Sequence, residues 1–148
     1  MKPELEYLQQ NFEQADEAAQ QLTNSVERCK DFISANNYSE NQLIELEALT
    51  FRFARMSDLF TQKVLKTIDA IEGTTPGTVR DRLLQAEKKK IVESADTFME
   101  IRKVRNQIAH EYEMNALNDI FFFAFKNANL LVDAIKAAKK YSQKFYTT

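Results

Sequence analysis

Two arginines, an asparagine and the only histidine of the chain fall in one short segment, between positions 102 and 110. On a helix, with about 100° of rotation per residue, Arg102, Asn106 and His110 follow one another along one arc because they are spaced by four. Arg105 lies at the border of this arc, and its long side chain can swing toward Asn106 and His110. The spacing therefore predicts a helical edge that carries positive charge, an amide and an imidazole.

This set of groups suits the cleavage of RNA, because the 2′-hydroxyl of RNA supplies the nucleophile. Cleavage needs a group that exchanges a proton near neutral pH, and histidine has an unperturbed pKa of roughly 6.5. It also needs fixed positive charge at the crowded phosphate of the transition state, which a guanidinium supplies. The sequence shows no His/Cys cluster at metal-ligand spacing, no Gly-rich phosphate loop and no nucleophile elbow. We therefore predict neither a metal nor a cofactor.

A histidine beside an arginine on a helix also occurs as an ordinary surface or capping residue, so spacing alone leaves that interpretation open. The projection places Tyr112 on the core-facing arc, as a half-buried amphipathic side chain. Asn106 has weak intrinsic helix propensity, which favours a polar role for it in mid-helix. The other side chains expected on the core-facing arc are apolar: Phe98, Ile101, Val104 and Ile108.

The segment belongs to a chain of 148 residues, 44% hydrophobic, which is the size of a single domain, 1–148. Three of its four Gly and Pro residues are Gly73, Pro76 and Gly77, so little else interrupts the chain and long helices are favoured. Cys29 is the only cysteine, and the N-terminus lacks an apolar export signal, which indicates a cytoplasmic protein without internal disulfides. No run approaches the roughly 20 apolar residues of a membrane-spanning helix.

Apolar residues recur at intervals of three or four along most of the chain, which predicts an all-α protein, an antiparallel bundle of four to five helices. A capping-box pattern at Ser39 with Gln42 and a further N-cap signal at Thr78, with Asp81 three residues later, predict two helix starts. Gly73 is suited to a helix end, and Ser94 to a further start. The helices are expected over about 4–34, 39–73, 79–89, 94–114 and 116–145.

The last of these helices is apolar on two sides, since Phe122 and Phe125 lie away from its main apolar face. Such a helix is either central in the bundle or shared with a partner subunit, and the sequence leaves both open.

Charge is unevenly distributed, although the net charge is only −2. Residues 1–79 carry seven basic and thirteen acidic side chains, whereas residues 80–148 carry thirteen basic and nine acidic ones. A basic face is therefore compatible with the acidic total, although solvated helix faces also produce such asymmetry. The residues expected to contact RNA are Arg80, Arg82, Arg102 and Lys103.

The motif Arg105-Asn106-x-x-Ala109-His110-x-Tyr112 resembles the Arg-x4-6-His signature of HEPN domains, in the form found in HepT-like ribonuclease toxins. The resemblance extends upstream over 78–88 and to the order of the helices. It implies a HEPN-type bundle and a homodimer in which the motif helices of two subunits face each other across one cleft.

The resemblance also implies metal-independent endoribonuclease activity. Arg105 would then stabilise the scissile phosphate, His110 would act in proton transfer or orientation, and Asn106 would assist. HepT-like toxins are commonly paired with a minimal nucleotidyltransferase antitoxin that adds AMP to the motif tyrosine, which corresponds to Tyr112. A bulky anion at the mouth of a basic cleft would repel RNA.

Two other functions stay open at this point. The chain could be a non-catalytic accessory or substrate-binding subunit of a nucleotidyltransferase. It could also be a structural helical dimer that uses the Phe122 and Phe125 face.

Overall fold

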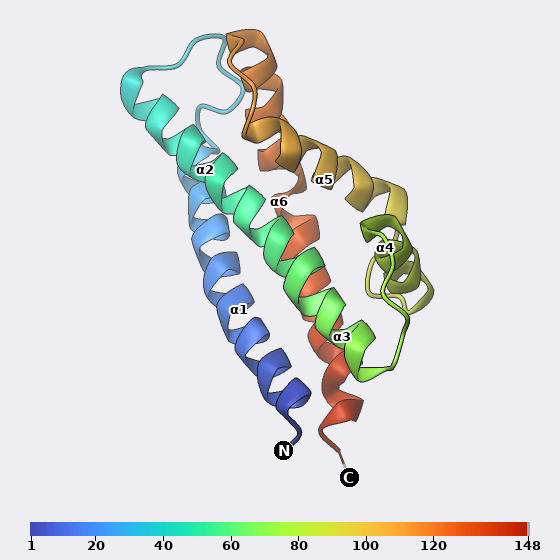
Figure 1. The fold of residues 1–148 in the computed structure, drawn as a ribbon. Coiled ribbons are helices and arrows are strands. Elements are labelled where there is room, and N and C mark those ends of the chain that lie inside the picture. The colour runs from blue at the N-terminus through green and yellow to red at the C-terminus, as the bar shows by residue number, and fades with distance from the viewer. Residues whose placement is uncertain (148) are drawn as a thin grey trace.

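A computed structural model describes residues 1–147, and within them every regular element is a helix, which confirms the all-α prediction (Figure 1). Three consecutive helical segments between Glu40 and Ile71 form one continuous rod. With this rod counted once, the described chain has five long helical elements, which agrees with the predicted four to five helices. The elements are α1 (Pro3–Cys29), α2 (Glu40–Asp58), the π-helix η1 (Leu59–Val64), α3 (Leu65–Ile71), α4 (Val79–Lys88), α5 (Ala95–Ile108), α6 (Met114–Ser142) and the 3-10 turn η2 (Gln143–Phe145).

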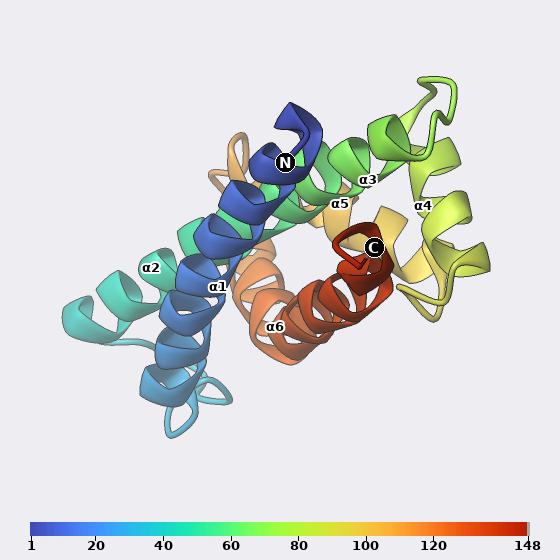
Figure 2. The same cartoon turned by 90° about the horizontal axis from the view of Figure 1, so that it is seen from below.

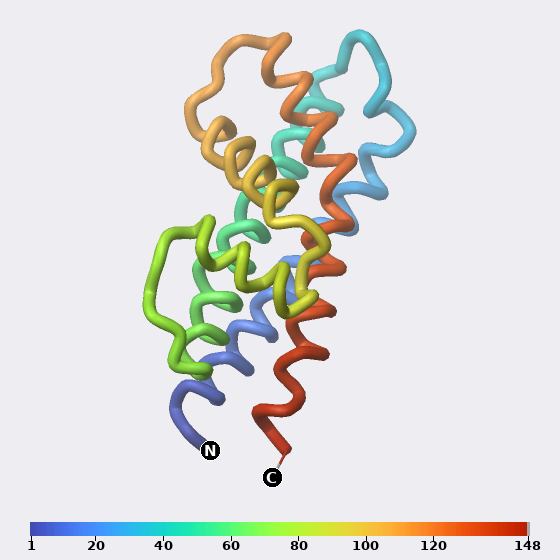
Figure 3. The backbone as a smooth tube through the Cα atoms, turned by 90° about the vertical axis from the view of Figure 1, so that its right-hand side faces the viewer, coloured from blue at the N-terminus to red at the C-terminus, as the bar shows by residue number. Residues whose placement is uncertain are grey.

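Three long rods form the body of the bundle. α1 runs antiparallel to the rod α2–η1–α3, and α6 packs against both, so that the two chain ends lie at the same end of the molecule (Figures 1 and 2). The shorter α4 and α5 follow each other along one side of the rod (Figure 3). α5 contacts α2, and α4 contacts η1 and α3, so the rod carries the motif helix.

The predicted helix signals are present as hydrogen bonds. Ser39 and Thr78 each form a complete capping box, in which their side chains accept from the backbone N–H of Gln42 and Asp81. Ser94 caps α5 by accepting from the backbone of Thr97. Gly73 ends the rod with φ +71°, the left-handed conformation that glycine adopts without a steric cost.

The π-helix within the rod was not predicted from the sequence. Its apolar residues there, from Met56 to Ile68, are spaced by four three times in succession. On an α-helix, a step of four residues turns the side chain about 40° past the direction of the previous one. A wider π turn removes this drift, and Met56, Phe60, Val64 and Ile68 are all fully buried. The π segment therefore keeps one apolar face directed at the core along the whole rod.

Two predicted helix ends were wrong. The first helix ends at Cys29 rather than near 34, and tight turns follow it. α5 ends at Ile108 rather than near Met114, because Glu113 starts α6 by accepting hydrogen bonds from the backbone N–H of Asn115 and Ala116. Glutamate is an unusual capping residue, so position 113 carries no ordinary signal for the start of a helix.

α6 is central in the bundle along its main apolar face, where Phe121 and Leu131 are buried. Of the second set, Phe125 packs half-buried against the core and Phe122 remains 49% exposed. Among residues 1–147, no helix combines the length and the apolar character needed to cross a membrane.

Glu72 joins the end of the rod to two other helices. It accepts hydrogen bonds from Lys89 Nζ (2.6 Å), just after α4, and from the hydroxyl of Tyr141 (2.6 Å) in α6. Burial alone would raise the pKa of Glu72, but the hydrogen bonds from Lys89 and Tyr141 outweigh it, so the pKa lies below its ordinary 4.5. A carboxylate with a depressed pKa stabilises the fold above the unfolded-state pKa, and this contribution falls as the pH drops through the folded-state pKa.

Replacing Glu72 by Gln is therefore expected to lower the free energy of unfolding by about 1–2 kcal/mol at pH 7, because Lys89 loses one of its two charged acceptors and keeps only Asp69. The difference from wild type should shrink as the pH falls below about 4.5. Urea denaturation between pH 3 and pH 7 measures it. Glu100→Gln, at an exposed position, is the control. A destabilisation that does not change with pH would contradict this role of Glu72.

Candidate functional site

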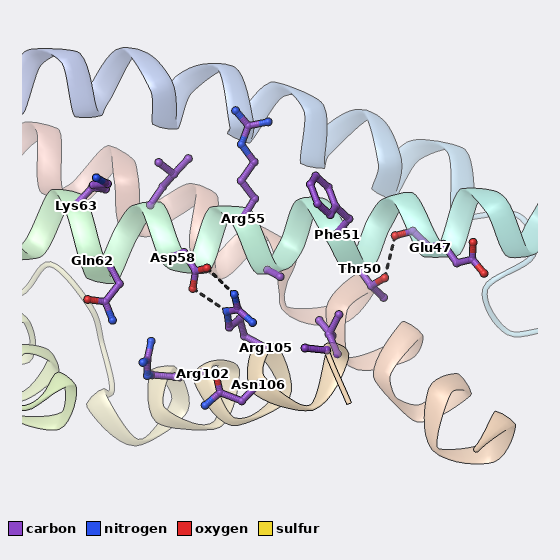
Figure 4. A pocket seen from close by; sticks show the side chains of 14 residues that line it. Glu47, Thr50, Phe51, Arg55, Asp58, Gln62, Lys63, Arg102, Arg105 and Asn106 are labelled. Atoms are coloured by element: carbon purple, nitrogen blue, oxygen red, sulfur yellow. Dashed lines mark hydrogen bonds and ion pairs between the residues drawn. The ribbon is translucent and has the colours of Figure 1, made fainter. Parts of the chain in front are cut away.

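A hollow of about 1020 Å³ lies between α2–η1 and α5 (Figure 4). Its two walls carry both charged and apolar side chains, and it is open to solvent along its length. The side chains that line it and are labelled in the figure are Glu47, Thr50, Phe51, Arg55, Asp58, Gln62, Lys63, Arg102, Arg105 and Asn106.

α5 brings three of the predicted site residues into this hollow. Arg102, Arg105 and Asn106 all line it, as expected for residues spaced by three and four on one helix. Their places follow from the burial of Ile101 and Val104 on the adjoining side of α5, which fixes the rotation of the helix. Lys103 is exposed on α5 and does not line the hollow.

His110 and Tyr112 lie beyond the end of α5, so their predicted positions on its helical arcs are wrong. His110 is exposed in the turn that follows the helix, where its backbone N–H donates to the carbonyl of Gln107 (3.0 Å). Ala109, directly before it, still lines the hollow. Tyr112 was expected to face the core but is 88% exposed, because the chain has left the helix before reaching it.

Asp58 holds the guanidinium of Arg105 in a bidentate ion pair. Arg105 Nε donates to Oδ1 and Nη2 donates to Oδ2, both at 2.8 Å, and both bonds are drawn in Figure 4. Asp58 is the last residue of α2, immediately before the π-helix. The pair therefore joins the rod to α5 across the floor of the hollow and fixes the direction of the guanidinium.

The ion pair also sets the charge of the site. Hydrogen bonding to Asp58 raises the pKa of Arg105 above its ordinary value, against a smaller effect of burial, so Arg105 stays protonated at every physiological pH. Nη1 of Arg105 makes no hydrogen bond to any residue within 1–147. It is the part of the guanidinium that remains for a bound anion.

Arg80 and Arg82, also expected to contact RNA, lie on α4 outside the hollow. Arg82 is turned inward, where Nη1 donates to the carbonyl of Thr61 in the π-helix (3.0 Å), and its side chain is only 10% exposed. Arg80 is exposed and lies 3.7 Å from Asp96. Arg82 thus supports the rod, and Arg80 is the one that faces solvent.

Sequence reasoning missed the wall of the hollow that α2 and η1 contribute. Asp58, Arg55 and Lys63 had no motif to single them out. Phe51 offered a usable signal, because it falls outside the apolar stripe of its helix, and the structure leaves it 65% exposed.

The arrangement is suited to bind an anion, since cationic side chains surround a hollow of molecular size. Among residues 1–147, no three His, Cys, Asp or Glu side chains are grouped so as to hold a metal ion. A scan against protein-family models, a search of curated proteins and a search of solved structures found no match for this chain.

The Asp58–Arg105 pair is partly exposed, with side chains 39% and 30% accessible, so we expect a modest energetic coupling. A double-mutant cycle of Asp58→Ala and Arg105→Ala should give a coupling of about 1 kcal/mol in the free energy of unfolding, and added salt should reduce it. Chemical denaturation of the four proteins measures it. Strictly additive effects would show that the pair does not hold the two helices together.

Proposed function

We propose that the protein is a metal-independent endoribonuclease toxin of the HEPN type, with its active site at the α5 edge of this hollow. The single observation that carries the proposal is that Arg102, Arg105 and Asn106 line one hollow whose edge leads directly to the exposed His110. The motif resembling the HepT-like form supplies the same residues in the same order.

Arg105 is arranged for its proposed role. Its guanidinium is fixed by Asp58 before any substrate binds, so little reorganisation is needed when charge builds up on a phosphate. The free Nη1 group and the side chain of Arg102, which forms no ion pair within residues 1–147, supply the positive charge. Asn106 adds a neutral hydrogen-bond donor beside them.

In the proposed reaction, the 2′-oxygen of a ribose attacks the adjacent phosphorus, and the bond from phosphorus to the 5′-oxygen of the next nucleotide breaks. His110 accepts the proton of the 2′-hydroxyl, and the leaving 5′-oxygen receives a proton from an acid. The products are a 2′,3′-cyclic phosphate and a 5′-hydroxyl end. The substrate therefore supplies its own nucleophile, and the protein supplies charge and proton transfer.

A homodimer completes this proposal. If two α5 edges face each other, each cleft holds two copies of Arg105 and His110, so that one imidazole serves as base and the other as acid. Met114, an apolar side chain that a second copy would cover, is 52% exposed at the start of α6, shortly after the motif.

The proposed regulatory partner is a minimal nucleotidyltransferase antitoxin that modifies Tyr112. The hydroxyl of a side chain 88% exposed is accessible to a modifying enzyme. Tyr112 lies two residues from His110, so an added adenylate would place negative charge beside the entrance of the cleft.

The purified protein should cut RNA in the presence of a chelator. His110→Ala should slow cutting by at least about 100-fold, because a proton-transfer group contributes that much or more, and Arg105→Ala should do the same through lost charge stabilisation. Gln107→Ala is the matched control, since Gln107 lies on α5 but lines a different hollow, toward α6. Cleavage of a labelled RNA, with thermal denaturation of each variant, measures the effects.

Equal cutting by wild type, His110→Ala and Arg105→Ala would refute the proposed site. A protein that cuts no RNA but forms a stable complex with a nucleotidyltransferase would support the alternative, a non-catalytic accessory subunit.

Co-expression with a minimal nucleotidyltransferase should add the mass of an adenylate to Tyr112, because that hydroxyl is exposed. Tyr112→Phe should abolish the modification, whereas Tyr141→Phe should not, since the Tyr141 hydroxyl is engaged with Glu72. Peptide mass spectrometry locates the adduct. An adenylate found elsewhere and never on Tyr112 would contradict the proposed regulation.

A further inference from the structure

A second hollow, of about 440 Å³, adjoins the first along the rod. It lies between the beginning of α1 and the segment η1–α3, where Tyr7 and Lys66 face it. Figure 2 shows the N-terminal end of α1 beside α3. Gln62 and Lys63 line both hollows, so the two are continuous across the outer surface of the rod.

The joined hollows carry an excess of positive charge in an acidic protein. Five cationic and three anionic side chains line them, an excess of two positive charges, whereas the whole chain has a net charge of −2. Such a local reversal of sign favours a polyanion at this surface. The cations are Arg55, Lys63, Lys66, Arg102 and Arg105, and the anions are Glu4, Glu47 and Asp58.

Most of these cations are not neutralised by the protein. Within residues 1–147, four of the five form no ion pair, namely all except Arg105. Other cations are neutralised by carboxylates, as Lys89 is by Glu72 and Lys139 is by Asp16. The charge of Arg55, Lys63, Lys66 and Arg102 therefore remains for a ligand.

An exposed aromatic ring marks each hollow. Phe51 in the first is 65% exposed, and Tyr7 in the second is 44% exposed. Lys63 Nζ lies 3.3 Å from the hydroxyl of Tyr7 and donates to it, which orients the ring beside the junction. Exposed rings beside free cations are the combination on which unpaired bases stack while their phosphates are bound.

We propose that the second hollow is a binding subsite for unpaired nucleotides of the RNA strand, with a base stacked on Tyr7 and phosphates held by Lys63 and Lys66. This inference rests on the proposed function, which identifies the strand as RNA. The rod spans about 22 Å between Phe51 and Lys66, at 1.5 Å per residue. That is the length of about six stacked nucleotides of one strand.

The probe is a fluorescein-labelled oligouridine of about twelve nucleotides, long enough to cover both hollows. Its ribose groups carry 2′-O-methyl, so it has no nucleophile and stays intact during the measurement. Fluorescence anisotropy with the full-length protein gives the Kd. Tyr7→Ala should raise the Kd by about tenfold, the effect of one lost stacked base, and Tyr7→Phe should leave it within about twofold.

Three further measurements test whether binding depends on an unpaired base at Tyr7 and on the two lysines. Phe122→Ala removes an exposed ring outside both hollows and should not change the Kd. A duplex RNA of about twelve base pairs should bind without any dependence on Tyr7, because it places no unpaired base there. Lys63→Gln with Lys66→Gln should reduce the salt dependence of binding, by about 0.7 per lost contact in the slope of log K against log[salt].

The outcomes separate this inference from the proposed function. Wild-type affinity in Tyr7→Ala, equal loss with Tyr7→Phe, or no binding of the strand by wild type would overturn the subsite. Cleavage of natural RNA with an unchanged Kd in Tyr7→Ala would sink the subsite and leave the ribonuclease in place. Tyr7-dependent binding without any cleavage would support the subsite and reject the ribonuclease.

Discussion

The structure depends on one continuous helical rod, from Glu40 to Ile71, that must bury one face over its whole length. An α-helix with this sequence would rotate its apolar residues away from the core, and the π-helix Leu59–Val64 prevents this by widening the turn where the spacing requires it. All neighbouring helices pack on the rod. The carbonyl of Thr61, in the same π-helix, also accepts a hydrogen bond from Arg82 of α4. The π-helix therefore helps to hold α4 against the rod.

The candidate site lies on the outside of that rod, and its charges are organised by a second constraint. Asp58 at the start of the π-helix takes two of the hydrogen bonds of Arg105, which costs the site part of its positive charge but fixes the guanidinium. A fixed guanidinium is more useful to a transition state than a mobile one, because no reorganisation is needed as charge develops. The unpaired cations around it compensate for the charge of Asp58.

Much of the fold could be predicted from the sequence, because its determinants are local. Capping boxes at Ser39 and Thr78 and the positive φ of Gly73 depend on residues that are close in the chain. The end of α5 could not be predicted, since Glu113 is an unusual capping residue. That single boundary moved His110 off its expected arc and turned Tyr112 from the core to solvent. Asp58 and Arg105 are 47 positions apart, and no local pattern indicates that they meet.

The most direct test of the proposed cleavage uses an RNA in which the nucleotide at the cleavage position lacks its 2′-hydroxyl. The protein, incubated with this RNA and a chelator, should leave that bond intact, while the all-ribose strand is cut there and ends in a 2′,3′-cyclic phosphate visible by mass spectrometry. Cutting of both strands at the same bond, or a 3′-hydroxyl end on the product, would contradict a mechanism in which the substrate provides its own nucleophile.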